Sequence, residues 1–174
     1  MQGKVCLVTG ANRGIGKEIA RGLARAGWTV MVHSRTAEKA AATVAELKAE
    51  TGNEKIRGFH ADFLVQSEVR RLAAEVIATT DRLHLLVNNA GTFNLYRTSA
   101  PDGHEATFTV NHLGPFILTR ALKELLKASA PSRVVNVASE AHQRVTNVED
   151  WESAKGYTGY QAYARSKVAN VMFT

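Results

Sequence analysis

Short apolar runs alternate along the chain with longer stretches in which apolar residues recur every three or four positions. The short runs are nearly continuous in apolar character and rich in Val, Leu and Ile, which is typical of parallel strands covered on both faces. They predict five strands, at Lys4–Thr9, Trp28–His33, Lys55–His60, Leu83–Asn88 and Arg133–Ala138.

The stretches between these runs have the periodicity of amphipathic helices. Ile15, Ile19 and Leu23 recur every four residues, and later stretches repeat the pattern. We expect a long helix over about 103–130, with a kink at Pro115. Strands that alternate with helices predict the α/β class, as a Rossmann-type, doubly wound parallel sheet in three αβα layers and in one domain over 1–174.

Composition narrows the range of partners. Hydrophobic residues make up 45% of the chain and the net charge is +6, but the Lys and Arg residues are scattered, so a solvated basic surface is favoured over nucleic-acid binding. No apolar run reaches the roughly 18 residues of a transmembrane helix. The single Cys6 fits a reducing, cytoplasmic compartment, and the six histidines lack metal-ligand spacing, so we expect no metal.

A glycine-rich loop, Thr9–Gly16, lies between the first predicted strand and the first predicted helix. Gly10 suits a tight turn, Gly14 would let the backbone approach a pyrophosphate, and Gly16 would let the helix pack closely on the strand. The free N–H groups of a helix N-terminus also favour phosphate. Within this strand–loop–helix context, the pattern predicts a dinucleotide-binding loop, whereas the alternative is an ordinary glycine-rich turn.

The end of the second strand bears on the choice of cofactor. An NAD site usually places an acidic residue here to bind the ribose, but this chain has Ser34 and Arg35. The guanidinium of Arg35 suits a 2′-phosphate, and Arg13 in the loop would reach the same group. We therefore favour NADP(H) over NAD(H), and the alternative is that both arginines are ordinary surface residues.

Tyr163 and Lys167 are spaced four residues apart, so on a helix they share one face. A phenol has a reference pKa of about 10 and needs a neighbouring cation to act as an acid or base at neutral pH. Ser139 follows one predicted strand and Asn88–Gly91 ends the preceding one, at the sheet edge where ligands bind. Asn111, on the long helix, needs a polar partner, and we expect a kink with a water to supply it.

Taken together and in this order, these motifs resemble those of the classical short-chain dehydrogenase/reductase family, in its retinol-dehydrogenase-like branch. The resemblance covers the whole chain and implies NADP-dependent interconversion of a small-molecule carbonyl and an alcohol by hydride transfer. It implies that Tyr163 is the general acid/base, that Lys167 supports it and binds the nicotinamide ribose, that Ser139 orients the substrate oxygen, and that Asn111 holds a relay water. The cofactor-binding residues implied are Gly10, Asn12, Arg13, Gly14, Ile15, Gly16, Ser34, Arg35, Asp62, Phe63, Asn89, Ala90, Gly91, Tyr163 and Lys167.

One feature departs from the family pattern: classical members continue well beyond the position of Thr174, through further strands and a lid over the substrate. The alternative expectation is therefore a truncated, inactive isoform or fragment that acts as a nucleotide-binding or interaction module. Family members commonly form homodimers through two long helices, here about 103–130 and from Tyr160 onward, and the second of these is cut short.

Overall fold

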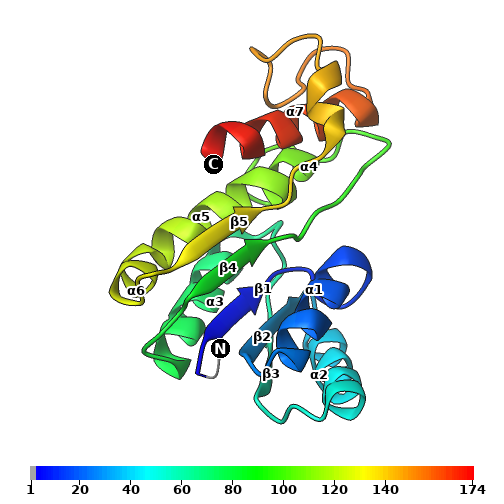
Figure 1. The fold of residues 1–174 in the computed structure, drawn as a ribbon. Helices are drawn as coiled ribbons and strands as arrows, with labels where there is room; N and C mark the ends of the chain where they lie inside the picture. The colour runs from blue at the N-terminus through cyan, green and yellow to red at the C-terminus, as the bar shows by residue number, and fades with distance from the viewer. Residues whose placement is uncertain (1–2) are drawn as a thin grey trace.

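The computed structural model describes residues 3–174 as alternating strands and helices around one sheet (Figure 1). The elements in chain order are β1 (Val5–Val8), α1 (Gly14–Arg25), β2 (Thr29–Ser34), α2 (Ala37–Thr51), β3 (Ile56–His60), α3 (Gln66–Thr79), β4 (Leu85–Asn88), α4 (Ala106–Phe108), the π-helical turn η1 (Thr109–Leu113), α5 (Gly114–Ala121), α6 (Lys123–Ala128), β5 (Arg133–Asn136), the 3-10 turn η2 (Glu140–Arg144) and α7 (Gly159–Phe173).

All pairings in the five-stranded sheet are parallel, and the strand order is β3-β2-β1-β4-β5. The chain moves outward from β1 to β3, then crosses back to β4 on the other side of β1. The direction of winding reverses between β1 and β4, and in open α/β sheets ligands bind at this reversal, beyond the carboxyl ends of the strands. The predicted doubly wound Rossmann-type sheet is confirmed.

Alternate residues of the central strands face two separate apolar cores. Leu7 and Met31 pack against α3 and α5, while Cys6 and Val30 pack with α1 and α2 on the opposite face. This alternation explains why the strands are apolar throughout. β5 is an edge strand, and its Val135 is 44% exposed.

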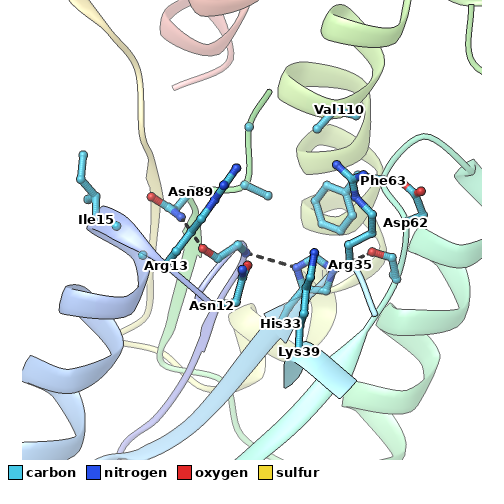
Figure 2. Close-up of a pocket in the computed structure, with 16 residues that line it drawn as sticks. Asn12, Arg13, Ile15, His33, Arg35, Lys39, Asp62, Phe63, Asn89 and Val110 are labelled. Atoms are coloured by element: carbon cyan, nitrogen blue, oxygen red, sulfur yellow. Dashed lines mark hydrogen bonds between the residues drawn. The ribbon is translucent and has the colours of Figure 1, made fainter. Parts of the chain in front are cut away.

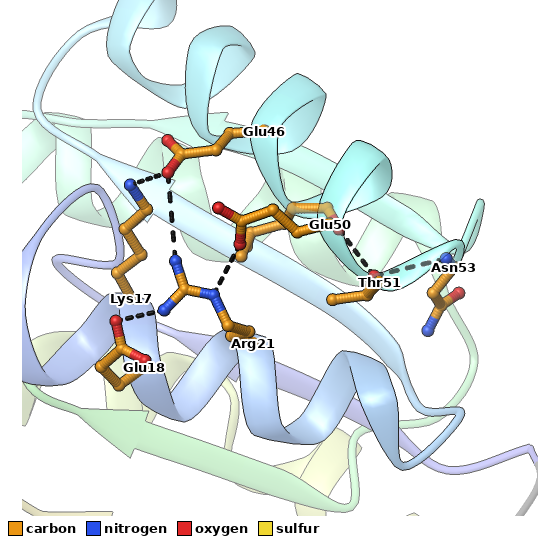
Figure 3. Close-up of polar contacts among 8 residues, drawn as sticks. Lys17, Glu18, Arg21, Glu46, Glu50, Thr51 and Asn53 are labelled. Carbon is orange, nitrogen blue, oxygen red and sulfur yellow. Dashed lines mark hydrogen bonds and ion pairs between the residues drawn. The ribbon is translucent and has the colours of Figure 1, made fainter.

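Helices α1 and α2 are also joined by ion pairs on their outer surfaces (Figure 3). Arg21 of α1 pairs with Glu18 on its own helix and with Glu50 of α2, at 2.6 Å from its Nε. Lys17 and Glu46 form a second link between the helices. These contacts link α2 to the helix that opens from the glycine loop, and ion pairs that solvent still reaches in this way add little stability.

The predicted long helix differs most from the structure. It is divided into α4, η1, α5 and α6, and its irregular turn, Thr109–Leu113, comes before Pro115, which lies in the first turn of α5. Pro115 therefore lies at the start of the regular helix α5, and the irregular turn of the helix precedes it. Among residues 3–174, no helix has the length and apolar character needed to span a membrane.

Candidate functional site

A pocket of about 530 Å³ lies at the carboxyl ends of the strands, where the winding of the sheet reverses (Figure 2). It is built from the loops that follow β1, β2, β3 and β4. The lining residues are Gly10, Asn12, Arg13, Gly14, Ile15, Gly16, His33, Arg35, Lys39, Ala61, Asp62, Phe63, Asn89, Ala90, Gly91 and Val110. The structure thus brings together, in one cavity, every predicted cofactor-binding residue except Ser34, Tyr163 and Lys167.

The glycine loop follows β1 with geometry that requires glycine at two positions. Gly10 has φ of 64°, and a Cβ there would come within 2.8 Å of the Ala90 Cα. At Gly16, a Cβ would overlap the Asn89 side-chain amide and would lie 2.6 Å from the Gly10 carbonyl oxygen. Gly14 has φ of 55° and open space where its Cβ would be, which leaves its backbone accessible from the pocket.

Thr9 and Asn89 lock this loop to the end of β4. The Thr9 hydroxyl accepts hydrogen bonds from the N–H groups of Asn89 and Ala90, at 2.9 and 3.0 Å. In return, the Asn89 amide donates to the carbonyl oxygens of Thr9 and Gly10, at 2.8 and 3.2 Å. The Asn89 side chain therefore stabilises the conformation of the glycine loop through hydrogen bonds to the loop backbone.

Three cationic side chains, Arg13, Arg35 and Lys39, line the same pocket. All three are exposed, and in the part of the chain that the structure describes none forms an ion pair with a carboxylate. Asp62 also lines the pocket, and its carboxylate accepts a hydrogen bond from the Leu64 N–H at 3.0 Å. The sequence analysis did not identify Lys39 as a site residue. Its place in the first turn of α2, four residues after Arg35, could have indicated that it lies near the same part of the pocket.

Ser34, which we predicted to bind the cofactor, does not line this pocket, and a role for it in cofactor binding stays a prediction. Its side chain is fully buried and does not line the cavity. Successive side chains of a strand point to opposite faces, so when His33 faces the pocket, Ser34 faces the other side of the sheet.

His33 is the second residue that sequence reasoning missed. Its ring is buried, stacks on Phe63 with 4.6 Å between centroids, and makes hydrogen bonds from both nitrogens. Nδ1 lies 3.3 Å from the Gly10 nitrogen, and Nε2 lies 3.0 Å from the Ala61 carbonyl oxygen. Burial lowers the pKa of His33 to about 4, so the ring is neutral at pH 7.

Tyr163 and Lys167 share one face of α7, as predicted. The Lys167 Nζ lies 5.5 Å from the centre of the Tyr163 ring and donates to the Val137 carbonyl oxygen at 2.9 Å. Burial lowers the pKa of Lys167. The Tyr163 ring, which is partly exposed, packs against Phe93 with 5.7 Å between centroids. Lys167 therefore contacts the segment just after β5, and Tyr163 contacts the segment after β4.

Ser139 lies three residues past the end of β5, where it caps η2 and accepts a hydrogen bond from the Ala141 N–H at 3.3 Å. Its hydroxyl makes no hydrogen bond to Tyr163, and neither Ser139, Tyr163 nor Lys167 lines the 530 Å³ pocket. Ser139, at the start of η2, and Tyr163 and Lys167, on the neighbouring helix α7, thus lie outside the cavity that holds the predicted phosphate-binding loop.

We expected a water as the polar partner of Asn111, but in the structure its buried side chain bonds to protein groups; the relay water itself stays a prediction. Its Oδ1 accepts from the Thr92 N–H at 2.7 Å, while its Nδ2 donates to the Thr92 carbonyl at 2.9 Å and to the Ser166 hydroxyl at 3.0 Å. Asn111 therefore joins the segment after β4 to the helix that carries Tyr163 and Lys167.

Comparison with known proteins gives results that agree with this architecture. A family model described as short chain dehydrogenase matches residues 4–174. Human retinol dehydrogenase 13 is 41% identical over 175 residues, and the match covers 99% of this chain and 53% of that protein. Retinol dehydrogenase 12 of Mus musculus is 42% identical, with 99% and 55% covered. The chain thus spans about half the length of these curated relatives.

Solved structures resemble the whole chain as well. An uncharacterized protein from Mycobacterium paratuberculosis superposes with a TM-score of 0.84 at 34% identity, covering 99% of this chain and 60% of that one. The RhlG/NADP active-site complex of Pseudomonas aeruginosa superposes with a TM-score of 0.78 at 34% identity, covering 99% and 65%.

Proposed function

Because the chain belongs to the short-chain dehydrogenase family, we propose that it is an NADP(H)-dependent oxidoreductase that interconverts a carbonyl and an alcohol in a small-molecule substrate. The observation that carries this proposal is the pocket at the reversal of the sheet. It combines a glycine loop, an open backbone at Gly14 and three cationic side chains. Such a cavity fits a phosphate-rich dinucleotide.

The cationic side chains support the preference for NADP(H). Arg35 follows β2, and Lys39 lies one helical turn further on, in the first turn of α2. Together with Arg13 they give the pocket an excess of positive charge, in which Asp62 is the single acidic residue. A 2′-phosphate would gain charge-assisted hydrogen bonds from these groups, whereas the free ribose hydroxyl of NAD(H) would not. The relative solved with NADP is consistent with this preference.

The residues proposed to act on the substrate lie on α7, which carries Tyr163 and Lys167, and at the start of η2, where Ser139 lies. The bound nicotinamide would supply hydride chemistry, and the protein's part is to hold the substrate oxygen and to move its proton. Tyr163 would exchange that proton at its hydroxyl, with the Lys167 ammonium nearby to favour the phenolate. Ser139 would orient the substrate oxygen by donating its hydroxyl proton to it, while the hydroxyl oxygen accepts from the Ala141 N–H. Asn111 would act by holding α7 against the segment after β4.

A second function is favoured by one observation, namely that the catalytic residues do not line the described pocket. In this alternative, the chain binds the nucleotide without turnover and acts as a nucleotide-binding or interaction module.

A cytoplasmic location, a homodimer and a single domain over 1–174 also stay predictions.

Two measurements test the proposal. Fluorescence titration should give saturable binding of NADPH, weakened about tenfold by Arg35→Ala through loss of a charge-assisted contact, with the NADH affinity little changed. Arg57→Ala, which removes an exposed arginine of β3 outside the pocket, is the matched control.

Turnover of small ketones with NADPH should be lost in Tyr163→Phe. Binding without turnover in the wild type would favour the module. An equal effect of Arg35→Ala on NADPH and NADH would argue against the NADP preference.

A further inference from the structure

The ring of His33 lies where three segments of the pocket meet. It contacts the glycine loop after β1 through the Gly10 N–H, and it contacts the segment after β3 through the Ala61 carbonyl and the Phe63 ring. The backbone of His33 adds another link, because its carbonyl oxygen accepts from the Ala11 N–H at 2.9 Å. One residue at the end of β2 thus holds the loops on both of its neighbouring strands.

The hydrogen-bond partners fix the tautomer of this ring. A backbone N–H can only donate and a carbonyl can only accept, so Nδ1 carries the lone pair toward Gly10, and Nε2 carries the proton toward Ala61. A protonated ring would present a second N–H to Gly10 and would lose that contact. Desolvation is the largest cause of the lowered pKa of His33, and nearby His60 lowers the pKa further. The hydrogen bond to the Ala61 carbonyl and the carboxylate of Asp62 act in the opposite direction and do not outweigh the desolvation.

We propose that His33 is a positioning residue for cofactor binding, which holds Gly10 and the glycine loop in the conformation that receives the phosphates. This proposal rests on the proposed dinucleotide function. Gly10 needs the tie because its backbone, at φ of 64°, is in the left-handed region, where an unanchored glycine samples many other conformations. Without an acceptor, its N–H would have to turn toward solvent in the pocket or remain unsatisfied.

Phe63 contributes to the same arrangement from the far side of the ring. A Cβ at Gly114, the first residue of α5, would come within 2.8 Å of the Phe63 ring, so this ring is held between α5 and His33. The His33 ring consequently has little freedom to move, which makes its Nδ1 a fixed acceptor.

Two substitutions separate the hydrogen bond from the packing. His33→Phe keeps an aromatic ring against Phe63 but removes both polar contacts. His33→Asn loses the ring but places an amide oxygen close to the position of Nδ1, so it retains an acceptor for Gly10. Val30→Ala, at a fully buried position on the same strand and outside the pocket, is the control for a general loss of stability.

The experiment combines NADPH titration with hydrogen exchange of the Gly10 amide, at a temperature where all variants are folded. We expect His33→Phe to raise the Kd for NADPH about tenfold and to accelerate Gly10 exchange. His33→Asn should keep the Kd within about threefold of the wild-type value, and Val30→Ala should lower the Tm and leave the Kd unchanged. The ¹⁵N shifts of the wild-type ring should report an unprotonated Nδ1.

Three results would overturn the proposal: an unchanged Kd in His33→Phe, an unchanged Gly10 exchange rate in that variant, or an equal loss of affinity in His33→Asn and His33→Phe. Failure of the wild type to bind NADPH at all would instead refute the proposed function. In that case, the Gly10 exchange rate alone would decide whether His33 fixes the loop.

Discussion

Replacing Gly16 by alanine tests whether the glycine loop and the segment after β4 are as closely packed as the structure indicates. The added methyl group would overlap the Asn89 side-chain amide and would lie 2.6 Å from the Gly10 carbonyl oxygen. Asn89 cannot yield easily, because its amide donates to the carbonyl oxygens of Thr9 and Gly10. Gly16→Ala should therefore force apart the two loops that form the centre of the pocket.

The magnitude follows from two contributions. Overpacking of a well-packed site costs about 1–3 kcal/mol, and each lost hydrogen bond of Asn89 costs about 1 kcal/mol. The free energy of unfolding should fall by about 2–4 kcal/mol. With a urea m-value of about 2 kcal/mol/M for a protein of this size, the unfolding midpoint should move by about 1–2 M. NADPH affinity should fall as well, because the loop is displaced.

Gly22→Ala is the matched control on the same helix. Gly22 has open space where its Cβ would be and ordinary helical φ, so alanine should raise stability by about 0.5–1 kcal/mol through helix propensity alone. Because both variants gain this helix propensity, the difference between their free energies of unfolding measures the cost of the steric overlap at Gly16. Equal stability of Gly16→Ala and Gly22→Ala would refute the close approach of Gly16 to Asn89.

Three further predictions concern buried polar groups. Because burial lowers the pKa of His33 to about 4 from 6.5, the unfolded chain binds the extra proton between these values, and the free energy of unfolding should fall by about 3 kcal/mol as the pH drops from 6.5 to 4. Urea titrations across this range should show the decline and should show a smaller one in His33→Phe; identical pH profiles would contradict the assignment. Asn111→Ala removes bonds to the Thr92 backbone and to Ser166, so a loss of about 2–4 kcal/mol is expected in chemical unfolding, and an unchanged midpoint would show that these bonds contribute nothing. Lys167→Met should cost less than about 1.5 kcal/mol, since burial already disfavours its charge, but it should abolish turnover; full activity in this variant would exclude Lys167 from the chemistry.

The strands and the glycine loop were predictable because local signals determine them. Continuous apolar runs located all five strands to within about two residues at each end, and the spacing of Gly10, Gly14 and Gly16 identified the loop. The positions of Tyr163 and Lys167 on one helix face followed from helical periodicity alone.

What could not be predicted depends on contacts between residues far apart in the sequence. The acceptor for Gly10 is His33 and the partners of Asn111 are Thr92 and Ser166, and no local pattern encodes either pairing. The absence of Ser34 from the pocket lining has a different reason, since the alternation of side chains along β2 sends it to the face opposite His33. Strand periodicity applied at that point would have placed His33, and not Ser34, on the pocket side of β2.

Calorimetric titration of the protein with NADPH and NADH would show whether this pocket binds the phosphates of NADP(H). We expect one saturable site with a lower Kd for NADPH, and loss of that preference in Arg35→Ala. An absence of saturable binding, or equal Kd values for the two nucleotides in the wild type, would contradict it.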